Sequence, residues 1–342
     1  MSGADDARIG FVAIGRNEGE RLARCLQSLP RQGSPAVYVD SGSTDASVAT
    51  AQSLGVGVVS LEDDRPFTAA RARNAGFAKL VADWPDVAYV MFIDGDCELA
   101  PEWPRTAAFL LDDYPEVAVV CGRLRERRPD ASLYNRLCDI EWDAPAGDTI
   151  ACGGVAMHRR SAFAAAGGFD EALVGGEEPE LCVRLREQGW AIRRLEAEMA
   201  VHDAAITSFL EWADRMKRGG RAFAQVSHLH RRSPQRIWRR EEIRALFWAA
   251  ILPASLLGAL VVNPGFLALL AAYPLQVLRL ATIDRGKLAP SARERPWVYA
   301  IFMTIAKFPE AAGVLEFHLG RLAATIGAGG RRKKDAKLTA RV

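Results

Sequence analysis

Residues Val87–Asp96, with the sequence VAYVMFIDGD, decide the fold class of this chain. Seven apolar residues in succession are typical of a β-strand that is buried on both faces. The run ends on Asp94-Gly95-Asp96, so two carboxylates leave the strand at its carboxyl end. Proteins hold Mg²⁺ or Mn²⁺ with one or two carboxylates plus the phosphates of a substrate, so this position favours a metal site. A surface turn is the alternative, because turns often contain the same pattern.

Similar apolar runs precede this strand, at Ile9–Ile14, Ala36–Asp40 and Val56–Leu61. Helical patterns alternate with the strands, at Glu18–Leu29, Asp45–Leu54, Thr68–Ala82 and Glu102–Leu111. We expect Ser43 or Thr44 to cap the second helix. Strands that alternate with helices predict an α/β fold with a mostly parallel central sheet, covered on both sides. Ligands of such sheets bind at the carboxyl ends of the strands.

A second acidic strand end lies at Asp40, where VYVD leads through Ser41-Gly42-Ser43-Thr44 into a helix. The Asp40 carboxylate can accept hydrogen bonds from a nucleobase or a ribose, and Gly42 permits a close approach. The alternative is a strand–turn–helix connection whose polar residues only cap the helix. Arg16-Asn17-Glu18 follows the first strand and offers similar polar groups.

Composition narrows the class of protein. The chain has 342 residues, 25% charged and 49% hydrophobic, with a net charge of +2. These values exclude a disordered or collagen-like chain, and the near-neutral charge argues against a nucleic-acid binder. The six cysteines never form a C-x-x-C pair, so we expect buried thiols of a reducing compartment rather than disulfides or zinc ligands. The start MSGADDARIG lacks the pattern of a secretory signal, so we expect the protein in the cytoplasm.

The C-terminal third has a different character. The Arg-dense segment 231–244 leads into Ala245–Val262 and Phe266–Leu278, which carry no charge and are joined by Asn263-Pro264-Gly265. Each arm is at or below the ~20 residues that cross a bilayer, so we predict an apolar hairpin over about 245–281 that is re-entrant or tightly packed. Basic residues flank both ends, which places both ends on the cytoplasmic side. A hairpin buried in a soluble helical subdomain is the alternative.

A second segment, about 297–323, resembles an amphipathic helix or helix pair at a membrane interface, broken near Pro309. The basic tail 331–334 either meets anionic lipid headgroups or is a solvated terminus. Between the strands and the hairpin, a helical stretch carries cations that can hold a diphosphate or a lipid phosphate, or simply face anionic lipid. These cations are Arg215, Lys217, Arg218 and Arg221.

Five motifs occur in a fixed order: AIGRNEGERLARCLQSL, VYVDSGSTDAS, RARNAGFA, FIDGDCEL and GGFDEALVGGEEPELCVRLREQGW. Together they resemble the family 2 glycosyltransferases of the GT-A fold, of the bacterial membrane-associated type that builds envelope glycans or exopolysaccharides. The resemblance covers about residues 8–200. It implies a GT-A catalytic domain over 1–230, with a nucleotide-binding half (about 8–100) and an acceptor half (about 101–230), followed by a helical membrane-associated region over 231–342.

The resemblance also implies a set of site residues. On the donor side, Glu18 and Asp40 bind the nucleotide, Arg71 lies near the diphosphate with Asn74 beside it, and Asp94 contacts the ribose or the metal. Asp96 is the principal ligand of Mn²⁺ or Mg²⁺, and His202 the candidate third ligand. The glycines around 152–154 and 167–169 lie where the family builds its acceptor platform, or form simple turns. Gly15-Arg16 departs from the family, because a Thr-Tyr or Thr-Phe pair is common there.

The catalytic base is implied by GGEEPEL, where the family shows Glu-Asp before a helix. Glu178 takes the position of that Asp, with Glu177 as the alternative. A carboxylate there can accept the proton of an attacking hydroxyl. Pro179 suits the first turn of a helix, and acidic side chains are favoured at a helix N-terminus. An acidic helix start without catalysis is the structural alternative.

These features predict an inverting, metal-assisted glycosyltransferase. Its partners are a nucleotide-sugar donor, a glycan or lipid-linked acceptor and anionic lipids, at the cytoplasmic face of the inner membrane. A sugar-phosphate nucleotidyltransferase is a weaker alternative, because it needs a Gly-rich loop with Lys or Arg after the first strand and GRNEGER does not provide one. A non-catalytic, membrane-tethered glycan-binding scaffold is the third possibility.

Overall fold

The computed structural model describes residues 8–30, 34–283 and 290–339. The chain divides into two compact units, Met1–Phe209 with Arg285–Arg295 and Leu210–Asp284 with Pro296–Val342. Helix α8 (Phe209–Leu229) therefore groups almost wholly with the C-terminal helices, whereas the sequence placed it in a domain spanning 1–230.

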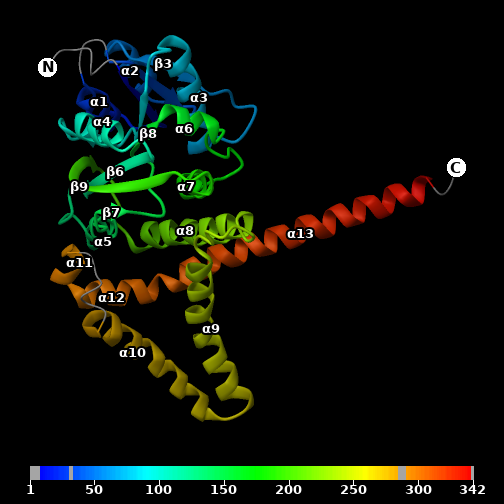
Figure 1. Cartoon of the computed structure of the whole chain (residues 1–342). Coiled ribbons are helices and arrows are strands. Elements are labelled where there is room, and N and C mark those ends of the chain that lie inside the picture. Colours follow the sequence, from blue (N-terminus) through cyan, green and yellow to red (C-terminus); the bar gives the residue numbers. More distant parts are fainter. Residues whose placement is uncertain (1–7, 31–33, 284–289, 340–342) are drawn as a thin grey trace. The chain divides into compact units, whose positions relative to one another are not determined.

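The first unit is built on a mixed sheet in the order β3-β2-β1-β4-β8-β6-β9-β5, with β7 beside β9 (Figure 1). Its strands are β1 (Ile9–Gly15), β2 (Ala36–Asp40), β3 (Gly57–Ser60), β4 (Tyr89–Asp94), β5 (Cys97–Leu99), β6 (Val117–Glu126), β7 (Gly147–Asp148), β8 (Ala156–Arg159) and β9 (Ala191–His202). The first four pair in parallel, and each antiparallel pair among the described residues involves β5, β7 or β8. The predicted α/β fold with a mostly parallel sheet is confirmed.

The helices of this unit are α1 (Glu20–Ser28), α2 (Ser47–Ser53), α3 (Ala69–Asp83), α4 (Trp103–Asp113), α5 (Leu133–Glu141), α6 (Arg160–Ala165), α7 (Glu177–Glu187) and α11 (Pro290–Glu294). Every strand and helix predicted before residue 112 is present, with slightly shifted ends. The predicted cap of α2 was wrong: the capping position is Ala46, and the Ser47 amide donates to Asp45. Ser43 and Thr44 are instead bonded to Asn17, in the loop after β1.

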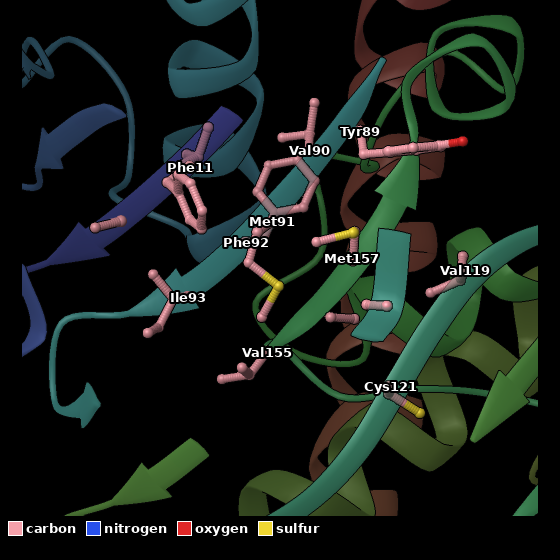
Figure 2. Packing of buried hydrophobic residues seen from close by; sticks show 14 of the residues in the cluster. Phe11, Tyr89, Val90, Met91, Phe92, Ile93, Val119, Cys121, Val155 and Met157 are labelled. Atoms are coloured by element: carbon pink, nitrogen blue, oxygen red, sulfur yellow. The ribbon is translucent and has the colours of Figure 1, made fainter. Parts of the chain in front are cut away.

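Strand β4 forms the centre of the core. Val90, Met91, Phe92 and Ile93 are completely buried, which confirms a strand covered on both faces. Figure 2 shows these side chains between Phe11 of β1 and Met157 of β8, the strands that flank β4. Burying a side chain of this kind contributes about 1.5–3 kcal/mol. The position of Asp94 at the end of β4 is therefore fixed by a strand with four completely buried side chains.

All six cysteines are buried free thiols, as expected. Cys152 and Cys182 approach each other, with 3.6 Å between their sulfur atoms. The hydrogen bond with Cys182, followed by burial, raises the pKa of Cys152 well above its ordinary value, so the Cys152 thiol is unreactive.

The second unit is helical. It consists of α8, α9 (Arg239–Val261), the 3₁₀ segment η2 (Pro264–Ala271), α10 (Ala272–Leu278), the short π-helix η3 (Arg279–Ile283), α12 (Pro296–Ile305) and α13 (Lys307–Thr339). Helix α9 packs against η2, which leads into α10 (Figure 1). At the turn between α9 and η2, the Asn263 side chain accepts a hydrogen bond from the Gly265 amide at 2.7 Å. The break predicted near Pro309 lies at Ala306, and Pro309 occupies the first turn of α13, where proline is tolerated.

Among the described residues of this unit, three segments are long and apolar enough to cross a membrane: Arg239–Val261, Pro264–Thr282 and Pro296–Thr325. Three consecutive apolar side chains are strongly exposed at the hairpin tip, with Leu260 82%, Val261 77% and Val262 70% exposed. The basic tail 331–334 lies in the part of α13 whose side chains fall outside the described residues.

Candidate active site

The carboxyl ends of β1, β2 and β4 meet at one edge of the sheet. Gly15 of β1 pairs with Asp40 of β2, and Ile14 pairs with Asp94 of β4. Asp40 and Asp94 therefore lie at the same edge of the sheet, with Glu18 in the loop directly after β1.

The loops after β1 and β2 are tied together by side chains. The Asn17 amide donates to Ser43 Oγ at 2.9 Å, and the Thr44 amide donates to Asn17 Oδ1 at 2.7 Å. Asn17 has a positive φ of 57°, a conformation that asparagine tolerates better than most residues. The Gly19 amide adds a bond to Asp45 at 3.1 Å. This edge of the sheet is therefore ordered by the chain itself.

Asp40 is buried and its carboxylate holds the turn that follows. Oδ2 accepts bonds from the amides of Gly42 (3.0 Å) and Ser43 (2.9 Å), while Oδ1 accepts one from the Tyr38 hydroxyl (3.0 Å). Gly42 has a φ of +80°, and a Cβ there would lie 3.0 Å from the Phe67 ring. Asp40 thus has the turn-forming role that the sequence left open as the alternative, at the place where the nucleotide was expected.

Phe67 was missed by the sequence analysis. It precedes α3, and two guanidinium groups lie near its ring, with Arg16 Cζ 5.5 Å and Arg71 Cζ 6.0 Å from the ring centroid. Arg16 is exposed, so it presents a flat cationic group at the position where the family often has an aromatic residue. The only sequence signal was an aromatic residue just before the R-x-R-N segment.

Arg71 and Asn74 order the loops on either side of α3. Arg71 is buried and donates to the Arg65 carbonyl (2.8 Å) and to Asp64 (2.7 Å). Asn74 exchanges two hydrogen bonds of 2.9 Å with the backbone of Phe169. The Asn74 amide is therefore engaged with the turn at Gly167–Phe169, where we expected the acceptor platform.

Arg73 is the second residue that the sequence analysis missed. Its Nη1 donates to Glu177 Oε1 at 2.8 Å and to Glu178 Oε1 at 2.9 Å, and its Nη2 donates to Asp94 Oδ1 at 2.7 Å. Arg73 is only 2% exposed. Residues two apart on a helix point in different directions, so the motif alone cannot tell which arginine reaches the strand ends.

Gly154 lies directly against this cluster. A Cβ at Gly154 would be 2.3 Å from Arg73 Nη2, 2.9 Å from Asp94 Oδ2 and 3.1 Å from Glu178 Oε1. No other residue fits there without displacing the charged groups. Glycine is therefore needed at this position for steric reasons, and not only to form a turn.

Glu178 lies in the first turn of α7, which follows Gly176 in a left-handed conformation (φ 83°). Burial raises the pKa of Glu178 to about 7, with a further contribution from Glu177 and an opposing one from Arg73. A carboxylate with a pKa near neutrality is well suited to accept a proton at physiological pH. Glu177, the alternative base, is 4% exposed and bonded to Arg73.

Asp96 and His202 form a candidate metal site. His202 Nε2 lies 3.0 Å from Asp96 Oδ2, and the potential ligand atoms of Asp96, Cys97 and His202 lie within 4.8 Å of one another. The Cys97 thiol is a soft ligand, whereas Mg²⁺ and Mn²⁺ favour oxygen, so Cys97 is the least suited of the three. The His202 Nδ1 atom is buried without a hydrogen-bond partner in the described residues. A carboxylate and an imidazole at this spacing fit a Mn²⁺ or Mg²⁺ ion.

Glu18 lies close to the same site. Burial, followed by the charge of Asp96, raises the pKa of Glu18, while Arg21 opposes this through a 2.7 Å ion pair. A Cβ on Gly95 would meet the Glu18 side chain at 3.1 Å. Glu18 therefore packs against the Asp94-Gly95-Asp96 turn.

The chain is similar in sequence and in fold to known glycosyltransferases. Residues 12–164 match the family model described as glycosyl transferase family 2, and residues 140–204 match one described as the N-terminal domain of galactosyltransferase. The pre-mycofactocin glycosyltransferase of Mycobacterium tuberculosis is 28% identical over 242 residues, which cover 67% of this chain and 49% of the relative. A TPR repeat-containing protein of Synechococcus elongatus is 31% identical over 144 residues, which cover 42% of this chain and 34% of the relative. The chain thus spans a third to a half of the length of these relatives.

Among solved structures, the fold is similar to that of the mannosyltransferase PcManGT from Pyrobaculum calidifontis, in complex with GDP-Man and Mn²⁺. The TM-score is 0.59 at 18% sequence identity, covering 90% of this chain and 87% of the other.

Proposed function

This chain carries a family 2 glycosyltransferase domain of the GT-A fold, and from that premise we propose that it is an inverting enzyme. It transfers a sugar from a nucleotide-sugar donor to a hydroxyl of a glycan or lipid-linked acceptor. The observation that carries this proposal is the juxtaposition of Glu178, at the start of α7, with Asp94, at the end of β4, through the shared partner Arg73.

The chemical step assigns a role to Glu178. Its carboxylate takes the proton of the acceptor hydroxyl while the oxygen attacks the anomeric carbon of the donor sugar. The bond between that carbon and the departing diphosphate oxygen breaks on the opposite side, so the configuration inverts. A pKa near 7 leaves a large fraction of Glu178 ionised at neutral pH. Glu177 is less suited, because it is more deeply buried.

The donor nucleotide is proposed to bind at the joined strand ends. Glu18 and the turn held by Asp40 contact the nucleoside, and Arg71 and Asn74 act through the loops that they order on the diphosphate side. Asp94 serves the ribose or the metal. Asp96 and His202 hold Mn²⁺ or Mg²⁺, which when bound neutralises the charge of the leaving group.

The helical unit is proposed to attach the enzyme to the cytoplasmic face of the inner membrane. The exposed apolar hairpin supports insertion, and arginines at its base, including Arg239, Arg240 and Arg244, support contact with anionic headgroups. Basic residues at both ends favour a cytoplasmic location for both. A membrane-proximal, lipid-linked acceptor of envelope or exopolysaccharide synthesis is consistent with such an attachment.

The test is release of nucleoside diphosphate by the detergent-solubilised full chain from UDP-, GDP- and dTDP-sugars, with Mn²⁺, Mg²⁺ or chelator. We expect metal-dependent release from one donor, lost in Asp96→Ala and strongly reduced in Glu178→Gln. Asp83→Ala, an exposed carboxylate at the end of α3, is the control. The proposal is refuted by absence of both turnover and calorimetric nucleotide binding across the panel.

A further inference from the structure

Arg73 connects the two halves of the candidate site. Its guanidinium bonds to the end of β4, which carries Asp94, and to the start of α7, which carries Glu177 and Glu178. These elements are far apart in the sequence, and the residues joined are separated by 21, 104 and 105 positions. A single buried side chain therefore sets the relative position of the proposed base and the D-x-D turn.

The Arg73 side chain stays protonated despite its burial. Burial lowers the pKa of the guanidinium, but Asp94, Glu178 and Glu177 more than reverse this, and the pKa ends above its ordinary value. Within the described residues, no other cation is bonded to Glu177 or Glu178. Without Arg73, these carboxylates would face one another in a buried space with no counter-charge, which is strongly unfavourable.

The position of the guanidinium is also fixed sterically. The backbone at Gly154 leaves no room for a methyl group beside Nη2, and the Phe169 ring centroid lies 5.7 Å from Cζ. The two Nη atoms point to different elements, Nη1 to α7 and Nη2 to β4. Such a fork is a property of arginine: lysine carries the same charge on one nitrogen and cannot reproduce the planar geometry.

We propose that Arg73 is a positioning residue that holds Glu178 at a fixed distance from Asp94, through the fork of its guanidinium and not through its charge alone. The inference rests on the proposed function, because it assumes that Glu178 acts as the base. Misplacement of a reacting group by about 1 Å costs about 100-fold in rate, so loss of the fork should appear in kcat.

The experiment compares full-length wild type, Arg73→Lys and Arg73→Ala with Arg123→Lys. Arg123 is a matched control, because it is also a buried arginine, 8% exposed, and it bonds to Asp139 (3.2 Å) and Asp143 (3.6 Å) outside the candidate site. For each variant we would measure kcat, nucleoside diphosphate binding by calorimetry with saturating Mn²⁺, and thermal stability. Arg73→Ala would be assayed with added guanidinium or methylammonium at equal ionic strength.

We expect Arg73→Lys to lose about 100-fold in kcat while binding the nucleoside diphosphate like the wild type. Guanidinium, but not methylammonium, should restore turnover to Arg73→Ala, and Arg123→Lys should keep its kcat. Full activity in Arg73→Lys, or rescue by methylammonium, would show that charge suffices and overturn the proposal. Parallel loss of nucleotide binding would make Arg73 a donor-binding residue and also overturn it.

Two further measurements keep the test decisive if the Arg73 variants are unstable or the wild type is inactive. Gly154→Ala retains Arg73 but puts a methyl group where its Nη2 lies, so the same selective loss of kcat is expected. Amide exchange at 176–180 does not depend on turnover, and it should accelerate in Arg73→Lys but not in Arg123→Lys. Unchanged exchange contradicts the positioning role, whereas an inactive wild type with accelerated exchange in Arg73→Lys contradicts only the proposed function.

Discussion

Asp96 and His202 lie in contact, with 3.0 Å between Oδ2 and Nε2, although 106 residues separate them in the chain. The antiparallel pairing of β5 with β9 brings them together, because Cys97, the neighbour of Asp96, is the register partner of His202. Burial alone would lower the pKa of His202, but the effect of Asp96 is larger and the pKa of His202 is raised. Burial alone would raise the pKa of Asp96, but the effect of His202 is larger and the pKa of Asp96 is lowered. The contact therefore favours the protonated His202 ring, and a metal ion must displace that proton to bind through Nε2.

Metal binding should consequently depend on pH. His202 coordinates a metal only when its ring is neutral, and its pKa is raised above 6.5, so Mn²⁺ affinity should increase as the pH rises through that pKa. Asp96→Asn should weaken Mn²⁺ binding at every pH. Electron paramagnetic resonance of free Mn²⁺ between pH 6 and 8 measures both effects, with Asp83→Asn as the control. An affinity independent of pH would contradict the assignment of His202 as a ligand.

The pKa of Glu178 predicts the pH profile of the reaction. The base acts in its deprotonated form, and burial raises its pKa to about 7, so kcat/KM should rise with pH and reach half its plateau near 7. Glu178→Gln should remove this limb and most of the activity. The measurement is the rate of sugar transfer, or of donor hydrolysis, from pH 4 to 8.5. A half-rise near 4.5, the value of an ordinary glutamate, would show that a solvated carboxylate is the base.

Features that neighbouring residues determine could be predicted from the sequence, whereas contacts between segments far apart in the chain could not. The apolar run of β4 and the Asp94-Gly95-Asp96 turn lie within ten residues, so the pattern contained both. The choice between Arg71 and Arg73 depended on how α3 is rotated against the sheet, which the R-x-R-N motif does not encode. The capping prediction for α2 was wrong because Ser43 and Thr44 are used by Asn17, from a different loop.

Arg16 and Phe67 yield a prediction for the nucleobase. The exposed Arg16 guanidinium lies over the Phe67 ring at the edge where the nucleoside is proposed to bind, and can itself stack on a base. Stacking of this type contributes about 0.5–1 kcal/mol at exposed sites, so Arg16→Ala should weaken nucleoside diphosphate binding by about 2- to 5-fold. Pyrophosphate, which has no base, should bind equally to both proteins.

Calorimetry with both ligands tests this expectation. Arg8→Ala is the matched control, because Arg8 also lies over an aromatic ring, Tyr89 at 5.9 Å, at the start of β4, away from the proposed nucleoside site. Equal losses for the two ligands would assign Arg16 to the diphosphate instead of the base.

The packing of α8 against α13 depends on two glycines. A Cβ on Gly220 would lie 2.0 Å from the Glu310 carbonyl oxygen, and one on Gly313 would lie 2.0 Å from that of Lys217. Backbone atoms cannot move aside cheaply, so Gly220→Ala and Gly313→Ala should each destabilise the protein by about 1–3 kcal/mol. Gly219→Ala is a control of opposite sign, because nothing lies within 4 Å of its Cβ position and alanine is the better helix former by about 0.5–1 kcal/mol. Thermal unfolding in detergent measures all three, and equal effects at Gly219 and Gly220 would contradict the close approach of the helices.

The hairpin tip provides the test of membrane attachment. Leu260 is 82% exposed at the end of α9, and a lysine in the hydrocarbon region costs about 2.5–3.5 kcal/mol. Leu260→Lys should therefore release much of the protein from vesicles in a sedimentation assay. Phe109→Lys, which changes a 52% exposed side chain on α4, should not.

Vesicles with anionic lipid should retain more protein than neutral ones, and this difference should shrink at high salt, because screening weakens the contribution of the arginines near 239–244. Equal sedimentation of wild type and Leu260→Lys would mean that the tip does not enter the bilayer, even if the basic residues hold the protein on its surface.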